Sequence, residues 1–137
     1  MTLKLTQDAV DLGFIVSDPG PMVAFYRDVL GMEYICEQPV GPGGTMHRLL
    51  CGKSEIKLQV PNVPIEAKTP KGVRAQTGLR YFTIRVSNLE ELVRRCEAAG
   101  CEFHVPLKEF RPGSWYAQVY DPEGNVVALT QDGPAGK

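Results

Sequence analysis

The feature that most constrains the fold of this chain of 137 residues is an internal repeat. Three pairs of segments match in the same order, with offsets between 69 and 71: 11–18 with 81–88, 30–34 with 99–103, and 56–58 with 127–129. One such match can arise by chance, but three nearly equal offsets indicate duplication. We therefore expect two copies of one module of about 55 residues.

Each module begins with a strand and a helix. Residues 11–17 and 80–87 alternate apolar and polar side chains, which is typical of half-buried strands. Helical spacing of apolar residues then predicts helices over 19–30 and 89–99. For the second helix we expect Asn88 as N-cap with Glu91 completing a capping box, and Gly100 after the last turn.

Three short strands are expected after each helix. They are predicted over 32–38, 45–51 and 54–60 in the first module, and over 102–106, 114–120 and 125–131 in the second. Each module therefore reads βαβββ, and the fold class is α+β. We expect one domain over residues 1–137, with module one at about 9–60, a linker at 61–77 and module two at about 78–131.

Composition excludes several classes of partner. The chain has 15 Lys and Arg against 16 Asp and Glu, and this balance leaves no basic footprint for nucleic acid. No apolar run approaches the roughly 18 residues that cross a membrane. The four cysteines form no CxxC pair, and we expect them to be free thiols. We expect a cytoplasmic protein that binds neither nucleic acid nor membrane.

Three segments of this chain resemble one known family. They are VSDPGPMVAFYRDVLGMEY (16–34), VSNLEELVRRCEAAGCEF (86–103) and DPEGNVVAL (121–129). They are similar to the vicinal oxygen chelate superfamily, which includes glyoxalase I, extradiol dioxygenases and bleomycin-binding proteins. The resemblance covers about residues 9–131. It implies that each module curls into half of an open, curved barrel, and that the chain forms a homodimer.

The resemblance also places four positions that hold a divalent metal in the family. They fall on Asp11 and Lys57 in module one, and on Tyr81 and Ala128 in module two. A metal site needs several converging lone-pair donors, and only Asp11 is a good ligand. We expect no metal and no cofactor at these positions. A metal-dependent enzyme with displaced ligands stays open as an alternative.

Strand alternation predicts which side chains share the concave face with these positions. We assign catalysis to Lys57, Asp11 and Tyr81, because a cation and a phenol can polarise a carbonyl or move a proton. Substrate binding is assigned to the remaining polar residues of the face: Glu55, Gln59, Arg85, Tyr116, Gln118, Tyr120 and His47. The alternation in the strand at 45–51 is ambiguous, so His47 could lie on the concave face or on the opposite one. The opposite interpretation is that Asp11 and Lys57 form a buried salt bridge that replaces the metal structurally.

These assignments predict a metal-independent enzyme for a small-molecule ligand. Its reaction would be that of a lyase or isomerase acting on an oxygenated or carbonyl compound. The alternative is a protein that binds a drug or metabolite without turnover, as the bleomycin-binding relatives do. His104 is expected to have a structural or surface role. Lys68, Lys71 and Arg74 are expected to be solvated residues of the linker, although they could attract an anionic ligand.

Overall fold

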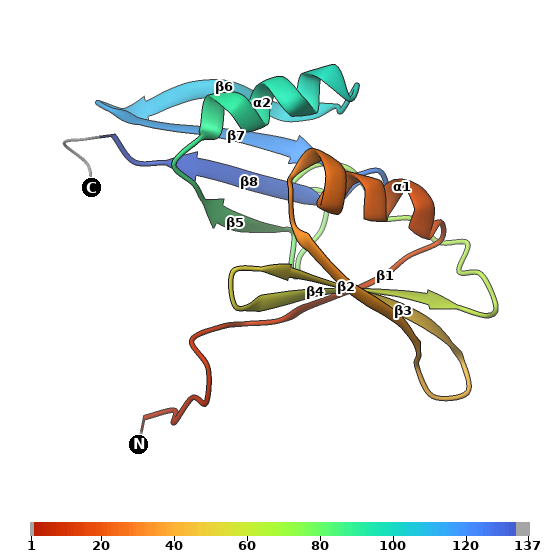
Figure 1. Ribbon diagram of the computed structural model, residues 1–137. Coiled ribbons are helices and arrows are strands. Elements are labelled where there is room, and N and C mark those ends of the chain that lie inside the picture. The colour runs from red at the N-terminus through yellow and green to blue at the C-terminus, as the bar shows by residue number, and fades with distance from the viewer. Residues whose placement is uncertain (1, 134–137) are drawn as a thin grey trace. The chain divides into compact units, whose positions relative to one another are not determined.

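The computed structural model describes residues 2–133, and the chain divides after Glu66 into two compact units (Figure 1). Unit one contains β1 (Leu12–Ile15), α1 (Pro19–Val23), the π-helix η1 (Ala24–Val29), β2 (Glu33–Pro39), β3 (Gly44–Cys51) and β4 (Ser54–Pro61). Unit two contains β5 (Tyr81–Arg85), α2 (Leu89–Ala98), β6 (Phe103–Arg111), β7 (Ser114–Tyr120) and β8 (Val126–Gln131). The duplicated βαβββ order and the α+β class are confirmed.

Each unit builds one four-stranded mixed sheet. The strand orders are β1-β4-β3-β2 and β5-β8-β7-β6, so the first strand of each unit pairs with its last. That pairing is parallel, and all others are antiparallel. A parallel pair needs a crossover connection, which here includes the helix and the two strands that follow it. The two sheets are therefore the same topology built twice.

One face of each sheet carries the apolar residues that bury the core. Leu49, Ile56 and Leu58 of unit one are at most 2% exposed, as are Met22 and Tyr26 of the helical segment. In unit two the corresponding side chains come from α2, β7 and β8: Leu89, Leu92, Val93, Cys96, Ala117, Val119, Val127 and Leu129. Alternation sends the intervening residues to the opposite face, which is where the polar side chains lie.

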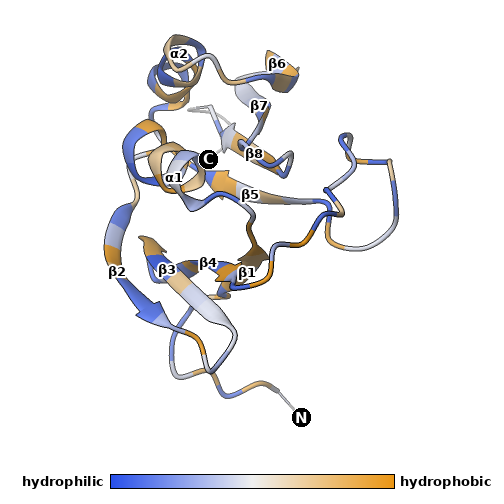
Figure 2. Cartoon of the chain, turned by 90° about the vertical axis from the view of Figure 1, so that its right-hand side faces the viewer, coloured by the Kyte–Doolittle hydropathy of each residue, from blue (hydrophilic) through white to orange (hydrophobic). Residues whose placement is uncertain are grey.

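Helix α2 begins and ends by different means. The side chain of Asn88 makes no capping bond to the backbone and instead donates to Glu91 at 2.8 Å, while the Leu89 amide donates to the Gln131 side chain. The predicted capping box is therefore wrong. The C-terminus is as expected, because Gly100 has φ +77° and the amides of Gly100 and Cys101 bond to carbonyls of the last turn. Figure 2 shows both apolar and polar residues along α2. Within residues 2–133, no helix is long and apolar enough to cross a membrane.

Strand β6 is longer than the sequence indicates. It runs to Arg111 rather than 106, with register shifts against β7 on both sides of Pro106. A proline is tolerated there because β6 is the edge strand of its sheet. The irregular pairing lets the strand continue past the residue that the sequence suggested as its end.

Candidate functional site

The register of β3 against β4 sorts the side chains of unit one. Arg48 lies opposite Lys57, and Lys57 lies opposite Gly13 of β1, so these positions share one face with Glu55 and Gln59. His47 lies opposite the buried Leu58 and therefore on the other face. Its Nδ1 is 2.7 Å from the Tyr34 hydroxyl. His47 does not belong to the polar face on which substrate binding was predicted.

Asp11 and Lys57 form the ion pair that the sequence predicts. Lys57 Nζ lies 3.8 Å from Asp11 Oδ2, and the other oxygen, Oδ1, accepts the backbone N–H of Glu55 at 2.8 Å. The Asp11 side chain is 46% exposed and that of Lys57 35%. The pair is solvated, and this exposure disfavours the alternative interpretation in which a buried salt bridge holds the unit together.

Arg48 carries the strongest charged contact of the same face. Its Nε and Nη2 each lie 2.7 Å from a different oxygen of Glu55. These hydrogen bonds lower the pKa of Glu55. Nη1 also reaches Gln38 at 3.2 Å and the Cys36 sulfur at 3.8 Å. Both carboxylate oxygens of Glu55 thus accept hydrogen bonds from Arg48. Arg48 was not among the predicted site residues, because the phase of its strand is ambiguous in the sequence.

The side chains at the four family metal positions do not fit a metal ion. Asp11 is the one carboxylate, and it is already bonded to the Glu55 amide and Lys57. The Lys57 ammonium would repel a cation, and Ala128 offers no donor atom. Among residues 2–133 no three His, Cys, Asp or Glu side chains come together as a metal-binding group. No step of chemistry is assigned to a metal at these positions.

The polar face of unit two carries the remaining predicted site residues. Tyr81, Thr83 and Arg85 of β5 share it with their partners on β8, and those partners pair with Tyr120, Gln118 and Tyr116 of β7. Arg85 points away into solvent, with a side chain 78% exposed and 3.8 Å from Asp132. The Tyr116 ring packs edge-on against Phe110 at 5.5 Å between centroids. Of this set, Tyr81 and Gln118 meet at one pocket.

The segment before β5 forms one wall of that pocket. The Arg80 guanidinium donates to the carbonyls of Pro70 and Gly72 at 2.7 and 2.8 Å. Lys71 forms an ion pair with Glu102, and its Nζ lies 5.3 Å from the centroid of the Tyr120 ring. These contacts attach the turn at 70–75 to unit two. The Lys71 side chain is nevertheless 57% exposed, so it is solvated as the sequence predicts.

The resulting pocket has a volume of about 440 Å³, and we call it the Tyr81 pocket. It is lined by Lys71, Gly72, Val73, Arg74, Ala75, Tyr81, His104 and Gln118. His104 Nδ1 lies 3.0 Å from the hydroxyl of Tyr120, and Nε2 has no hydrogen-bond partner within residues 2–133. The pocket thus combines an imidazole, a phenol and an amide with the cations Lys71 and Arg74. His104 was not among the predicted site residues; it lies within the first register shift of β6, between Phe103 and Val105.

The predicted site residues therefore separate into two groups. The group of unit one consists of Asp11, Glu55, Lys57 and Gln59, to which the structure adds Arg48. In unit two, the pocket is lined by Tyr81 and Gln118. The same face of unit two also carries Arg85, Tyr116 and Tyr120. The two groups differ in their chemistry. Unit one offers paired charges, whereas the Tyr81 pocket offers groups that can bind an oxygen-rich ligand and exchange protons.

Comparison with known proteins gives consistent matches over nearly the whole chain. Residues 9–129 match the sequence model of the Glyoxalase/Bleomycin resistance protein/Dioxygenase superfamily. An uncharacterized protein of Pseudomonas aeruginosa, PA2024, is 29% identical over 128 residues, which cover 91% of this chain and 89% of that protein.

Solved structures show the same fold at low identity. A glyoxalase family protein from Bacillus cereus superposes with a TM-score of 0.80 at 15% identity, covering 96% of this chain and 98% of its own. A glyoxylase/bleomycin resistance protein/dioxygenase domain from Frankia sp. EAN1pec superposes with a TM-score of 0.75 at 18% identity, covering 100% and 96%. At these identities the likeness concerns the fold, which hosts several chemistries.

Proposed function

Because the chain belongs to the Glyoxalase/Bleomycin resistance protein/Dioxygenase superfamily, we propose that it is a metal-independent enzyme for a small anionic carbonyl compound, with a lyase or isomerase reaction. The observation that carries this proposal is the Tyr81 pocket. It brings His104, Tyr81 and Gln118 to one cavity beside Lys71 and Arg74. These are the groups that proton transfer next to a carbonyl requires.

Each group has a role that follows from its chemistry. The Arg74 guanidinium attracts a carboxylate of the ligand, and it has no ion-pair partner among residues 2–133. The Tyr81 hydroxyl and the Gln118 amide donate to the carbonyl oxygen. The His104 imidazole removes the proton from the adjacent carbon, because a neutral imidazole nitrogen can act as a general base. The Tyr120 hydroxyl orients the ring through Nδ1.

Lys57 and Asp11 remain proposed catalytic residues of unit one. The ammonium is the one cation at a family metal position, where it would hold an anionic oxygen as a metal does in relatives. Asp11, whose Oδ2 lies 3.8 Å from the ammonium, directs it. Glu55 and Gln59, on the same face, are proposed to complete the ligand contacts of that unit.

Hydrogen exchange at carbon tests the proposal directly. The protein is incubated in D2O with EDTA and small 2-oxocarboxylates, with pyruvate and 2-oxobutyrate as the first two, and deuterium in the ligand is followed by NMR. We expect exchange that His104→Asn abolishes and Tyr81→Phe slows by about 10- to 100-fold. His47→Asn is the matched control, because His47 belongs to unit one, lies on the same face of its sheet as the buried Leu58, and does not line the Tyr81 pocket. Exchange that survives His104→Asn would contradict the assignment.

The second candidate function is ligand binding without turnover. It is favoured by the exposure of aromatic rings on the polar face, since Tyr81 is 52% and Phe110 44% exposed. Such rings bind flat or cationic drugs by stacking. Saturable binding of a compound without any exchange or conversion would select this function over the enzymatic one.

We also propose that the chain acts as a homodimer in the cytoplasm. Each sheet has two edge strands whose outer backbone groups are unpaired within it: β1 and β2 in unit one, and β5 and β6 in unit two. Exposed edges favour pairing with another chain. Light scattering should give twice the chain mass of 15.1 kDa. A value equal to the single-chain mass at working concentration would contradict the dimer.

A further inference from the structure

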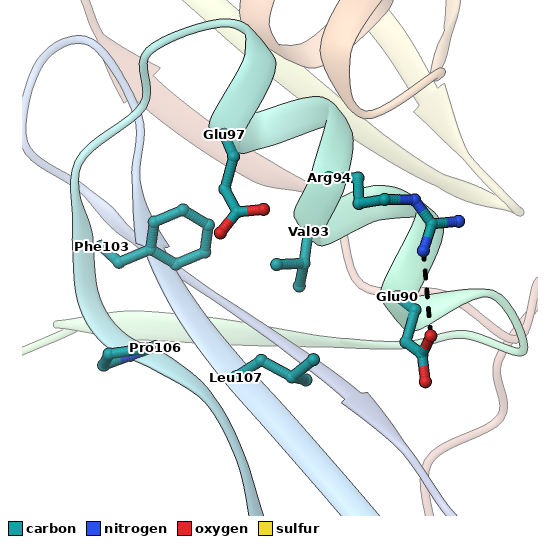
Figure 3. A pocket seen from close by; sticks show the side chains of 7 residues that line it. All are labelled: Glu90, Val93, Arg94, Glu97, Phe103, Pro106 and Leu107. Atoms are coloured by element: carbon teal, nitrogen blue, oxygen red, sulfur yellow. Dashed lines mark ion pairs between the residues drawn. The ribbon is translucent and has the colours of Figure 1, made fainter.

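A second cavity of unit two lies on the face opposite the Tyr81 pocket. It has a volume of about 450 Å³ and opens between α2 and β6 (Figure 3). We call it the α2 groove; its lining residues are Glu90, Val93, Arg94, Glu97, Phe103, Pro106 and Leu107. Phe103 pairs with the buried Val119, which places it on the helix side of the sheet. This volume is in the range of small-molecule sites.

The floor of the α2 groove is apolar. Val93 is 6% exposed, and Phe103 and Leu107 are half-buried on β6. In Figure 3 these side chains face a common space below the helix. Such a surface favours the apolar body of a ligand, because contact removes hydrocarbon area from water.

The rim of the groove carries one carboxylate without a counter-ion. Arg94 Nη1 lies 3.8 Å from Glu90, so these two charges offset each other. Glu97 forms no ion pair with any residue between 2 and 133. Figure 3 shows its carboxylate on the side of the groove where the Phe103 ring lies. An aromatic ring face also attracts cations, so both groups favour positive charge at that end.

From this combination we infer that the α2 groove binds a small organic cation, namely an ammonium group on an aryl or alkyl body. The ammonium group lies between the Glu97 carboxylate and the Phe103 ring, and the body covers Val93 and Leu107. A carboxylate of the same shape is repelled by Glu97, and a neutral analogue loses the charge-assisted hydrogen bond. This binding site is independent of the chemistry proposed for the Tyr81 pocket.

The test uses 2-phenylethylammonium as the probe and NMR of the 15N-labelled full chain as the readout. We expect saturable shift changes at amides of α2 and β6, and weaker binding as salt is added. The neutral 2-phenylethanol should bind at least about 10-fold more weakly, and 3-phenylpropionate should not bind. Glu97→Gln should weaken the amine about 10-fold, and Phe103→Leu should weaken it independently of that change.

Glu91→Gln is the matched control, because it removes one charge from the same helix outside the groove lining. It should change the affinity less than about 2-fold. Equal affinity for the amine and the alcohol would overturn the inference, as would loss of affinity in Glu91→Gln equal to that in Glu97→Gln. Shift changes in the groove that follow protein concentration without any amine would assign it to contact between copies, and would also overturn it.

Discussion

The Nζ of Lys57 lies 3.8 Å from Oδ2 of Asp11, so two side chains at family metal positions face each other as an ion pair in unit one. The contact is solvent-accessible, and Asp11 keeps a second bond to the Glu55 amide. A cation is thus held at this point of the sheet by the chain itself. The pair is available for a ligand and contributes little to folding.

This arrangement predicts the effect of Lys57→Met on stability. Because the pair is exposed and Asp11 remains hydrogen-bonded to the backbone, the free energy of unfolding should fall by less than about 1 kcal/mol. Urea unfolding measures it, with Lys53→Met in the exposed β3–β4 turn as control. A loss of about 3 kcal/mol or more would mean that the pair is structural after all.

The Arg48–Glu55 pair predicts a dependence of stability on pH. The hydrogen bonds from Arg48 lower the pKa of Glu55 in the folded protein below its ordinary 4.5. A carboxyl group with a lowered folded pKa stabilises the fold above its unfolded pKa, and this contribution is lost as the pH falls through the folded pKa.

Glu55→Gln should therefore be less stable than the wild type at neutral pH, and the difference should shrink as the pH falls below 4.5. Urea unfolding at about pH 7 and pH 3 gives both values. Glu33→Gln, an exposed residue of β2, controls for the loss of a carboxylate. A difference that is the same at both pH values would show that the charge of Glu55 is not what matters.

Burial predicts slow chemistry at one thiol. Desolvation raises the pKa of Cys96 to about 12, and it also raises the pKa of Cys101. Because the thiolate is the reactive form, labelling of Cys96 at pH 8 should be roughly 1000-fold slower in the native protein than in urea. Labelling followed by peptide mass spectrometry measures it. Equal rates in native and unfolded protein would contradict the burial of this side chain.

The sequence predicted the fold well because the repeat supplied two independent readings of each element. The parallel pairing of β1 with β4 follows from that order, and it brings Asp11 to Lys57. His47 was ambiguous because Leu49 and Leu50 put apolar side chains on both phases of β3. The register of β3 with β4 decides on which face of the sheet each side chain of β3 lies. No local sequence pattern contains that register.

The Tyr81 pocket could not be predicted because one wall comes from a segment without regular structure. Its position depends on the Arg80 guanidinium and on the pairing of Lys71 with Glu102, which is 31 residues away. The approach of His104 to Tyr120 depends in turn on the irregular pairing of β6 with β7. Side chains placed by such long-range contacts leave no periodic signal in the sequence.

The proposed function requires that the four family metal positions of this chain hold no metal ion. The most direct test is 15N NMR of untagged protein titrated with Zn²⁺ and with Ni²⁺, together with metal analysis of the purified protein. We expect no stoichiometric metal and no saturable shifts at Asp11, Lys57, Tyr81 or Ala128, because these residues supply a single carboxylate that is already bonded. One equivalent of metal bound with shifts centred on these four positions would contradict it.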